Sequence, residues 1–154
     1  MKPVSSLLLC FGICAALLAG CSSSAPDRPN PAPAQVVNPI VEVSSVEEME
    51  EMLDFSIPLL DKDVERYVVL VYDGGPQMGR VYYADGSLFS IKYGQEDVSG
   101  IYGGTLDSSE TVSGVQVDFY HYESSRYARW EKDGFSCSLT GDKSLSDDVA
   151  QLIG

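Results

Sequence analysis

The chain has 154 residues, with 23 acidic against 10 basic side chains and a formal net charge of −13 at pH 7. So acidic a surface repels the phosphates of nucleic acids and the headgroups of anionic lipids, and we expect no nucleic-acid partner.

The first 20 residues predict a secretory signal peptide. Lys2 is followed by an uncharged apolar run over residues 7–18. As a helix this run would rise about 18 Å, which is too short to cross a hydrocarbon layer of about 30 Å. A basic start, a short apolar middle and small residues at the end are typical of a cleaved signal peptide.

The end of this run, Leu18-Ala19-Gly20-Cys21, resembles the bacterial lipobox. The resemblance implies cleavage between Gly20 and Cys21 and a diacylglycerol on the sulfur of Cys21, because a thiolate is the nucleophile that accepts the lipid. Two or three acyl chains such as palmitate on one cysteine give stable anchoring. We therefore expect a lipoprotein held in the cell membrane through Cys21, on the extracytoplasmic face of the cell envelope.

Residues 22–38 read SSSAPDRPNPAPAQVVN and contain four prolines. They carry too little apolar mass to offset the entropy of ordering, and proline favours extended backbone. We expect residues 21–38 to be a lipidated cysteine with its tether, and residues 39–154 to be a single domain. Cys137 would be the one thiol left in that domain, so we expect no disulfide within the chain and a fold that depends on its hydrophobic core.

The pattern within residues 39–154 predicts a helix, a series of strands and a second helix. Ser45 and Glu48 fit a capping box ahead of helical apolar spacing over residues 46–53. Ser146 is the predicted cap of a closing helix within residues 144–153. Between them, apolar runs predict strands, and Asp-Gly pairs at 85–86 and 133–134 predict hairpins. These strands are expected over residues 66–72, 78–84, 87–93, 115–122, 127–131 and 135–140.

We therefore expect an α+β fold. Because the strands follow one another through short turns, an antiparallel meander of five or six strands is predicted, with an N-terminal and a C-terminal helix packed on one face.

Three passages resemble an uncharacterised extracytoplasmic domain family, a domain of unknown function. They are NPIVEVSSVEEMEEMLDFSIP (38–58), EDVSGIYGG (96–104) and ARWEKDGFSCSLTGDKSLSDDVAQLIG (128–154). The family occurs in bacterial lipoproteins and as the outer domain of membrane-anchored proteins that are similar to anti-sigma factors. The resemblance implies an extracytoplasmic location, and the family has no established enzymatic activity to carry over.

Few residues of this chain carry reactive chemistry. His121 and Cys137 are the residue types of a base and a nucleophile, but Cys137 lies in register with Phe135 and Leu139, which indicates a small core side chain. One histidine and one thiol exclude an ordinary zinc cage, and the acidic stretch 61–65 lacks the glycine of a calcium loop. We expect no catalytic residue, no metal and no cofactor.

The first candidate binding site is the turn Asp97-Val98-Ser99-Gly100. Its backbone amides have the spacing of an anion nest, so Asp97, Ser99 and Gly100 are candidate residues of a ligand-facing loop. The alternative is that the two side chains only hold the turn.

The second candidate is an aromatic surface for a peptide or a glycan, which requires several tyrosines on one open face. The alternative is that these tyrosines pack in the core or cover a half-exposed face. The candidates are Tyr82, Tyr93, Tyr120 and Tyr122.

The favoured function is a non-enzymatic binding or sensing domain whose partner is an envelope protein, a peptide or a glycan. One alternative is a small envelope hydrolase that uses carboxylates, which two acids converging in a deep cleft would favour. Another is a carrier of an apolar ligand, which a large apolar pocket beneath the helices would favour.

Overall fold

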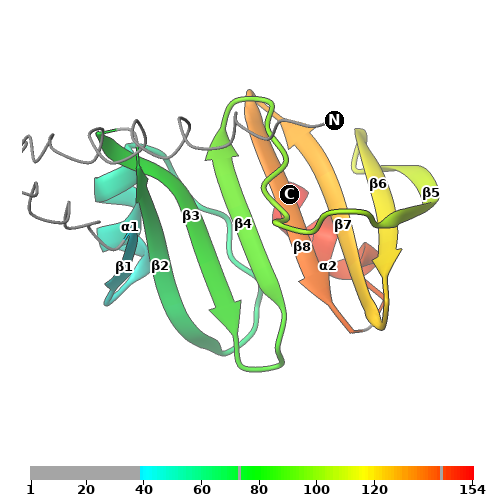
Figure 1. Cartoon of the computed structure of the whole chain (residues 1–154), viewed down its shortest axis with the longest axis horizontal. Coiled ribbons are helices and arrows are strands. Elements are labelled where there is room, and N and C mark those ends of the chain that lie inside the picture. The colour runs from blue at the N-terminus through cyan, green and yellow to red at the C-terminus, as the bar shows by residue number, and fades with distance from the viewer. Residues whose placement is uncertain (1–38, 73, 143) are drawn as a thin grey trace, which may run out of the picture. The chain divides into compact units, whose positions relative to one another are not determined.

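The computed structural model describes residues 39–72, 74–142 and 144–154 (Figure 1). The predicted signal peptide, Cys21 and the tether lie outside these residues. In the described ranges no helix has the length and apolar character needed to cross a membrane.

Eight strands form one antiparallel sheet that carries two short helices. The elements in chain order are β1 (Ile40–Val43), α1 (Val46–Leu53), β2 (Val64–Tyr72), β3 (Gly75–Tyr83), β4 (Leu88–Tyr93), β5 (Thr105–Val112), β6 (Val115–Tyr122), β7 (Ser125–Lys132), β8 (Phe135–Gly141) and α2 (Ser146–Ile153).

The sheet consists of two four-stranded meanders joined side by side. Its strand order is β1-β2-β3-β4-β8-β7-β6-β5, so the last strand, β8, pairs with β4 at the centre. Residues 94–104 carry the chain from the end of β4 across to β5 at the far edge (Figure 1). We call residues 94–104 the crossing segment.

The predicted α+β fold, a meander of five or six strands with an N-terminal helix, is wrong. The sheet has eight strands, its first element is the strand β1, and β8 returns to the centre instead of continuing a meander. The strand β5, TLDSSETV, has few apolar residues because it is an exposed edge strand with one neighbour. The strand β1 has only four residues, too few for a visible alternation.

The predicted helix over residues 46–53 is confirmed, and its start follows the capping-box pattern. The Oγ of Ser45 accepts a hydrogen bond from the backbone N–H of Glu48 at 3.3 Å. In a capping box the carboxylate of Glu48 would accept a hydrogen bond from the backbone N–H of Ser45. It accepts instead from the N–H of the preceding residue, Ser44, at 2.8 Å. The helix ends at Leu53, and the C-cap residue Asp54 has a left-handed φ of 62°.

The closing helix α2 begins at Ser146, and its cap residue is Leu145, which makes no side-chain cap hydrogen bond. The prediction that Ser146 is the cap is therefore wrong. The inward side of α2 is buried and consists of Val149, Leu152 and Ile153. These apolar contacts, rather than a capping hydrogen bond, hold the helix in place.

One face of the sheet and the two helices enclose the hydrophobic core. Val81, Phe89 and Leu139 lie opposite one another on β3, β4 and β8 and are completely buried. Met49 of α1 and Val149 of α2 belong to the same core cluster. In Figure 1 the helices lie behind the sheet and the crossing segment passes in front of it. We call the face opposite the helices the open face.

Candidate functional site

The crossing segment packs against the open face over β8 and β7 (Figure 1). Val98 and Ser99 are only 2% and 7% exposed, although they belong to a connection without regular structure. At Gly104 a Cβ atom would lie 2.1 Å from the hydroxyl oxygen of Tyr127 on β7. Glycine is therefore required where the backbone passes this tyrosine.

Two ion pairs fasten the crossing segment to the strands. Asp97 Oδ2 lies 3.0 Å from Arg129 Nη1 on β7, and the carboxylate of Glu96 accepts a hydrogen bond from Lys92 on β4. The hydrogen bond to Glu96 raises the pKa of Lys92. The Lys92 Nζ also lies 5.4 Å from the ring centre of Tyr72.

The side chains of the predicted ligand-facing loop hold its turn. Asp97 Oδ1 accepts hydrogen bonds from the backbone N–H and the hydroxyl of Ser99, at 2.9 and 2.7 Å. The Ser99 Oγ in turn accepts from the N–H of Ile101 at 3.2 Å, and Gly100 has a φ of 70°. A ligand role for Asp97, Ser99 and Gly100 stays a prediction, and the contacts account for the turn itself.

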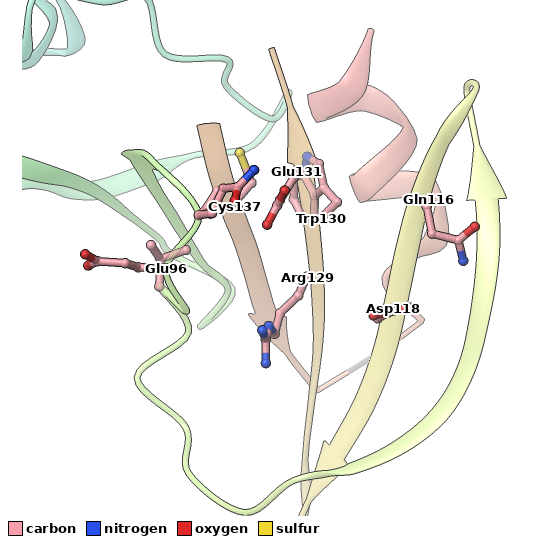
Figure 2. A pocket seen from close by; sticks show the side chains of 10 residues that line it. Glu96, Gln116, Asp118, Arg129, Trp130, Glu131 and Cys137 are labelled. Carbon is pink, nitrogen blue, oxygen red and sulfur yellow. The ribbon is translucent and has the colours of Figure 1, made fainter. Parts of the chain in front are cut away.

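A pocket of about 300 Å³ lies between the crossing segment and the strands β6, β7 and β8. Figure 2 shows Arg129 and Glu131 of β7 between Glu96 on one side and Gln116 and Asp118 of β6 on the other. Three carboxylates thus border the pocket, those of Glu96, Asp118 and Glu131. The guanidinium group of Arg129 is already paired with Asp97 of the crossing segment. The pocket is polar and has an excess of negative charge.

Trp130 and Cys137 also border this pocket, but their side chains belong to the core. The Trp130 ring is stacked on Phe89 with 6.1 Å between centroids. Burial raises the pKa of the Cys137 thiol to about 12. At neutral pH this thiol is protonated and is therefore a poor nucleophile.

The structure does not bring His121 and Cys137 together. His121 lies opposite Arg126, which pairs with Gly141, four residues along β8 from Cys137. The two residues are therefore two strands apart, which is roughly 10 Å across the sheet, and four residues apart along the strand direction, which is roughly 13 Å. The Nδ1 of His121 instead lies 2.6 Å from Asp107 Oδ1 on the edge strand β5.

The four predicted surface tyrosines do not share one patch. Tyr120 and Tyr122 lie on the open face of β6, and Tyr120 is stacked on Tyr127 at 4.9 Å. Tyr82 lies on the same face, but three strands separate its strand, β3, from β6, and the guanidinium of Arg66 covers its ring at 4.1 Å. Tyr93 pairs with Phe135 on the helix side of the sheet.

The acidic stretch 61–65 takes part in a structural ion-pair cluster. Lys62 Nζ lies 2.9 Å from Asp85 Oδ2 in the β3–β4 turn and 2.5 Å from Asp148 Oδ2 on α2. Hydrogen bonds from Ser87 and then from Lys62 hold the pKa of Asp85 well below its usual range. Among the described residues no three His, Cys, Asp or Glu side chains gather in an arrangement that would hold a metal ion.

Sequence reasoning missed three polar residues on the open face, Arg80, Ser90 and Ser138, which lie opposite one another on β3, β4 and β8. Each of the three has neighbours in its strand that point to the core. This alternation could have placed all three on the side of the sheet away from the core.

Comparison of the chain with models of known protein families, with curated proteins and with solved structures found no match. The resemblance described from the sequence therefore stays a prediction.

Proposed function

We propose that this protein is a membrane-anchored lipoprotein of the bacterial cell envelope that binds a polar ligand without converting it. The sequence motif that ends at Cys21 supports the anchor and the extracytoplasmic location. The pocket under the crossing segment supports the binding role, because three strands and a fastened connection hold its polar side chains in place.

The pocket favours a small polar group of a peptide or a glycan. Its volume of about 300 Å³ lies at the lower end of the range for ligand sites. Amide, hydroxyl and carboxylate groups from Gln116, Ser136 and Glu131 are suited to hydrogen-bond hydroxyl or ammonium groups. The negative balance favours a ligand with an amino group, such as an amino sugar or a lysine side chain.

Calorimetric titration tests the binding role with two probes, a glucosamine oligomer and a capped lysine-containing peptide. We expect one of them to bind, and Glu131→Gln to weaken that binding about fivefold, the effect of one partly exposed charge. Glu51→Gln is the matched control, because Glu51 is an exposed carboxylate on α1 outside the pocket. Absence of binding by both probes, or equal affinities of the two variants, would contradict the proposal.

Metabolic labelling with a fatty acid tests the anchor. Wild-type protein should incorporate the label and appear in the membrane fraction, whereas Cys21→Ala should do neither, because the sulfur that takes the lipid is missing. Cys137→Ala is the control and should be labelled like the wild type. Labelling of Cys21→Ala would contradict the proposal, because the lipid would then be attached to another residue.

A second candidate function, a small hydrolase, is favoured by the three carboxylates that border one pocket. Most enzymes that cleave a glycosidic bond use a pair of carboxylates. Product release from the glucosamine oligomer, lost on Asp118→Asn and on Glu131→Gln, would support this candidate over binding alone.

A further inference from the structure

The strand β5 forms one outer edge of the sheet, and its outward side has no neighbouring strand in the part of the chain that the structure describes (Figure 1). The strand at the opposite edge, β1, has only four residues, whereas β5 has eight. Every side chain of β5 is exposed or half-buried. An uncovered edge strand presents a row of N–H and C=O groups with which a further strand can pair.

The turn between β5 and β6 shows which backbone groups of β5 face outward. Residues 113–114 form a two-residue turn with positive φ values of 47° and 83°, so the flanking pair Val112 and Val115 exchanges hydrogen bonds. Along an antiparallel ladder such pairs alternate with pairs that do not bond each other. The N–H and C=O groups of Ser109 and Thr111 therefore point away from β6 and are available to a docked strand.

The charge of this edge indicates the kind of strand that fits it. The β5–β6 hairpin, residues 105–122, carries the acidic side chains Asp107, Glu110 and Asp118 and contains neither lysine nor arginine. A second copy of β5 would bring the same acidic side chains to the edge, and like charges opposite each other destabilise a strand pair. The charge therefore favours a basic segment over a second copy of this chain.

A small pocket of about 140 Å³ borders β5 and reaches the start of α2. Its lining includes Asp107, Ser108 and Glu110 of β5, residues 144–146, and Arg126 of β7. A cavity of about 150 Å³ holds a group of the size of benzene, so this pocket has room for one side chain. Its two carboxylates outnumber its one guanidinium, and carboxylates accept hydrogen bonds from an ammonium or guanidinium group.

The two faces of β5 differ in character. Glu110 lies opposite the core residue Val117, which places its side chain on the helix side of the sheet. Leu106 lies opposite Tyr120 on the open face, and its side chain is 51% exposed. Because side chains of a strand alternate between the two faces, a docked strand with basic residues toward the helix side and apolar residues toward the open face complements both.

We propose that β5 binds an extended segment of another protein as an additional strand, and that basic and apolar residues alternate in this segment. Main-chain hydrogen bonds to Ser109 and Thr111 supply affinity, and side chains on alternate faces supply specificity. A basic side chain beside Glu110 enters the small pocket, and apolar side chains contact Leu106. The site depends neither on the lipid anchor nor on the pocket under the crossing segment.

The first arm of the test measures the fluorescence anisotropy of a labelled, capped octapeptide of alternating arginine and valine with the full chain. Two further peptides of equal charge carry N-methyl groups on the arginine amides or on the valine amides. Alternate N–H groups of a strand face opposite edges, so one of the two should bind at least tenfold more weakly and the other like the parent. Equal affinities of the two methylated peptides would overturn the proposal, because charge alone would then explain the binding.

The second arm uses substitutions in the protein. Thr111→Pro removes one outward N–H and keeps the hydrogen bonds between β5 and β6, so it should weaken peptide binding about fivefold. Thr111→Val is the matched control, because it keeps this N–H, and should bind like the wild type. Glu131→Gln should also bind like the wild type. A loss on Glu131→Gln together with unchanged binding to Thr111→Pro would place the peptide in the pocket of the proposed function and overturn the proposal.

The third arm measures hydrogen exchange of the wild-type backbone amides by nuclear magnetic resonance, and it remains decisive if Thr111→Pro does not fold. Saturation with the peptide should slow exchange of the Ser109 and Thr111 amides at least tenfold, because their N–H groups become hydrogen-bonded. Unchanged exchange at both amides would overturn the proposal. So would a dimer of the free protein in sedimentation that Thr111→Pro dissociates, because a second copy would then occupy the edge.

Discussion

Helix α1 packs tightly on the sheet at Gly79 of β3, and this packing yields a quantitative prediction. A Cβ atom at this position would lie 3.0 Å from Leu53 Cδ1, 3.1 Å from Met49 Sδ and 3.2 Å from Ile57 Cδ1. Ordinary contacts between such atoms are about 3.5–4.0 Å long, so each contact would be too short by roughly half an ångström. Gly79→Ala therefore requires α1 and the chain after it to move.

The cost of this change follows from two opposing effects. Overpacking in a core costs about 1–3 kcal/mol, and replacing glycine by alanine returns about 0.4–1 kcal/mol by restricting the unfolded chain. We expect Gly79→Ala to lower the free energy of unfolding by about 1–2 kcal/mol. In a domain of this size that lowers the melting temperature by roughly 4–8 °C.

The matched control is Gly75→Ala on the same strand, where a Cβ would meet no atom within 4 Å. This variant should be as stable as the wild type or slightly more stable. Urea unfolding, followed by the fluorescence of the single tryptophan, Trp130, measures both variants. If Gly79→Ala proves as stable as Gly75→Ala, the close packing of α1 on β3 is not what makes glycine necessary.

A second substitution tests the contact itself. Leu53→Val removes the atom nearest to the new Cβ, so Gly79→Ala should cost less in that background than in the wild type. An equal cost in both backgrounds would show that Leu53 is not the residue that resists the added methyl group.

Two further predictions concern titratable groups. Burial raises the pKa of the Cys137 thiol to about 12, so the thiol should resist alkylation by iodoacetamide at pH 8 in the folded protein and react quickly in 6 M guanidinium. Peptide mass spectrometry measures both reactions, and fast alkylation of the folded protein would contradict the prediction. Because the pKa of Asp85 is lowered in the folded state, its carboxylate stabilises the fold above its unfolded pKa of about 3.8, and this contribution is lost as the pH falls below that value. Asp85→Asn should therefore be less stable than the wild type in urea at pH 7, and this difference should be smaller at pH 3. A difference that does not change with pH would refute the role of the Lys62 and Ser87 contacts.

The candidate site could be predicted only in part. The turn at Asp97 to Gly100 was identified because Asp and Ser bond backbone amides two residues away, which is a local effect. The pairing of Asp97 with Arg129 was not predictable, since 32 residues and two strands separate these two side chains in the chain. Arg80, Ser90 and Ser138 likewise lie opposite one another on three strands whose register is set by pairing at the centre of the sheet.

The sequence by itself determined the features that depend on neighbouring residues. The helix over residues 46–53, with its capping serine, follows from local hydrogen bonds and apolar spacing. The turns at 85–86 and 133–134 follow from the tolerance of glycine for positive φ, which Gly86 and Gly134 adopt.

Only the tertiary structure decided the number and order of the strands. The strand β5 is polar except for Leu106 and Val112, and its conformation comes mainly from backbone hydrogen bonds to β6. The return of β8 to the side of β4 brings Leu139 opposite Phe89, and the shared core selects that register among many antiparallel ones. The physical reason is that the strand order depends on burying side chains that lie far apart in the sequence against one another. No local sequence pattern encodes such contacts.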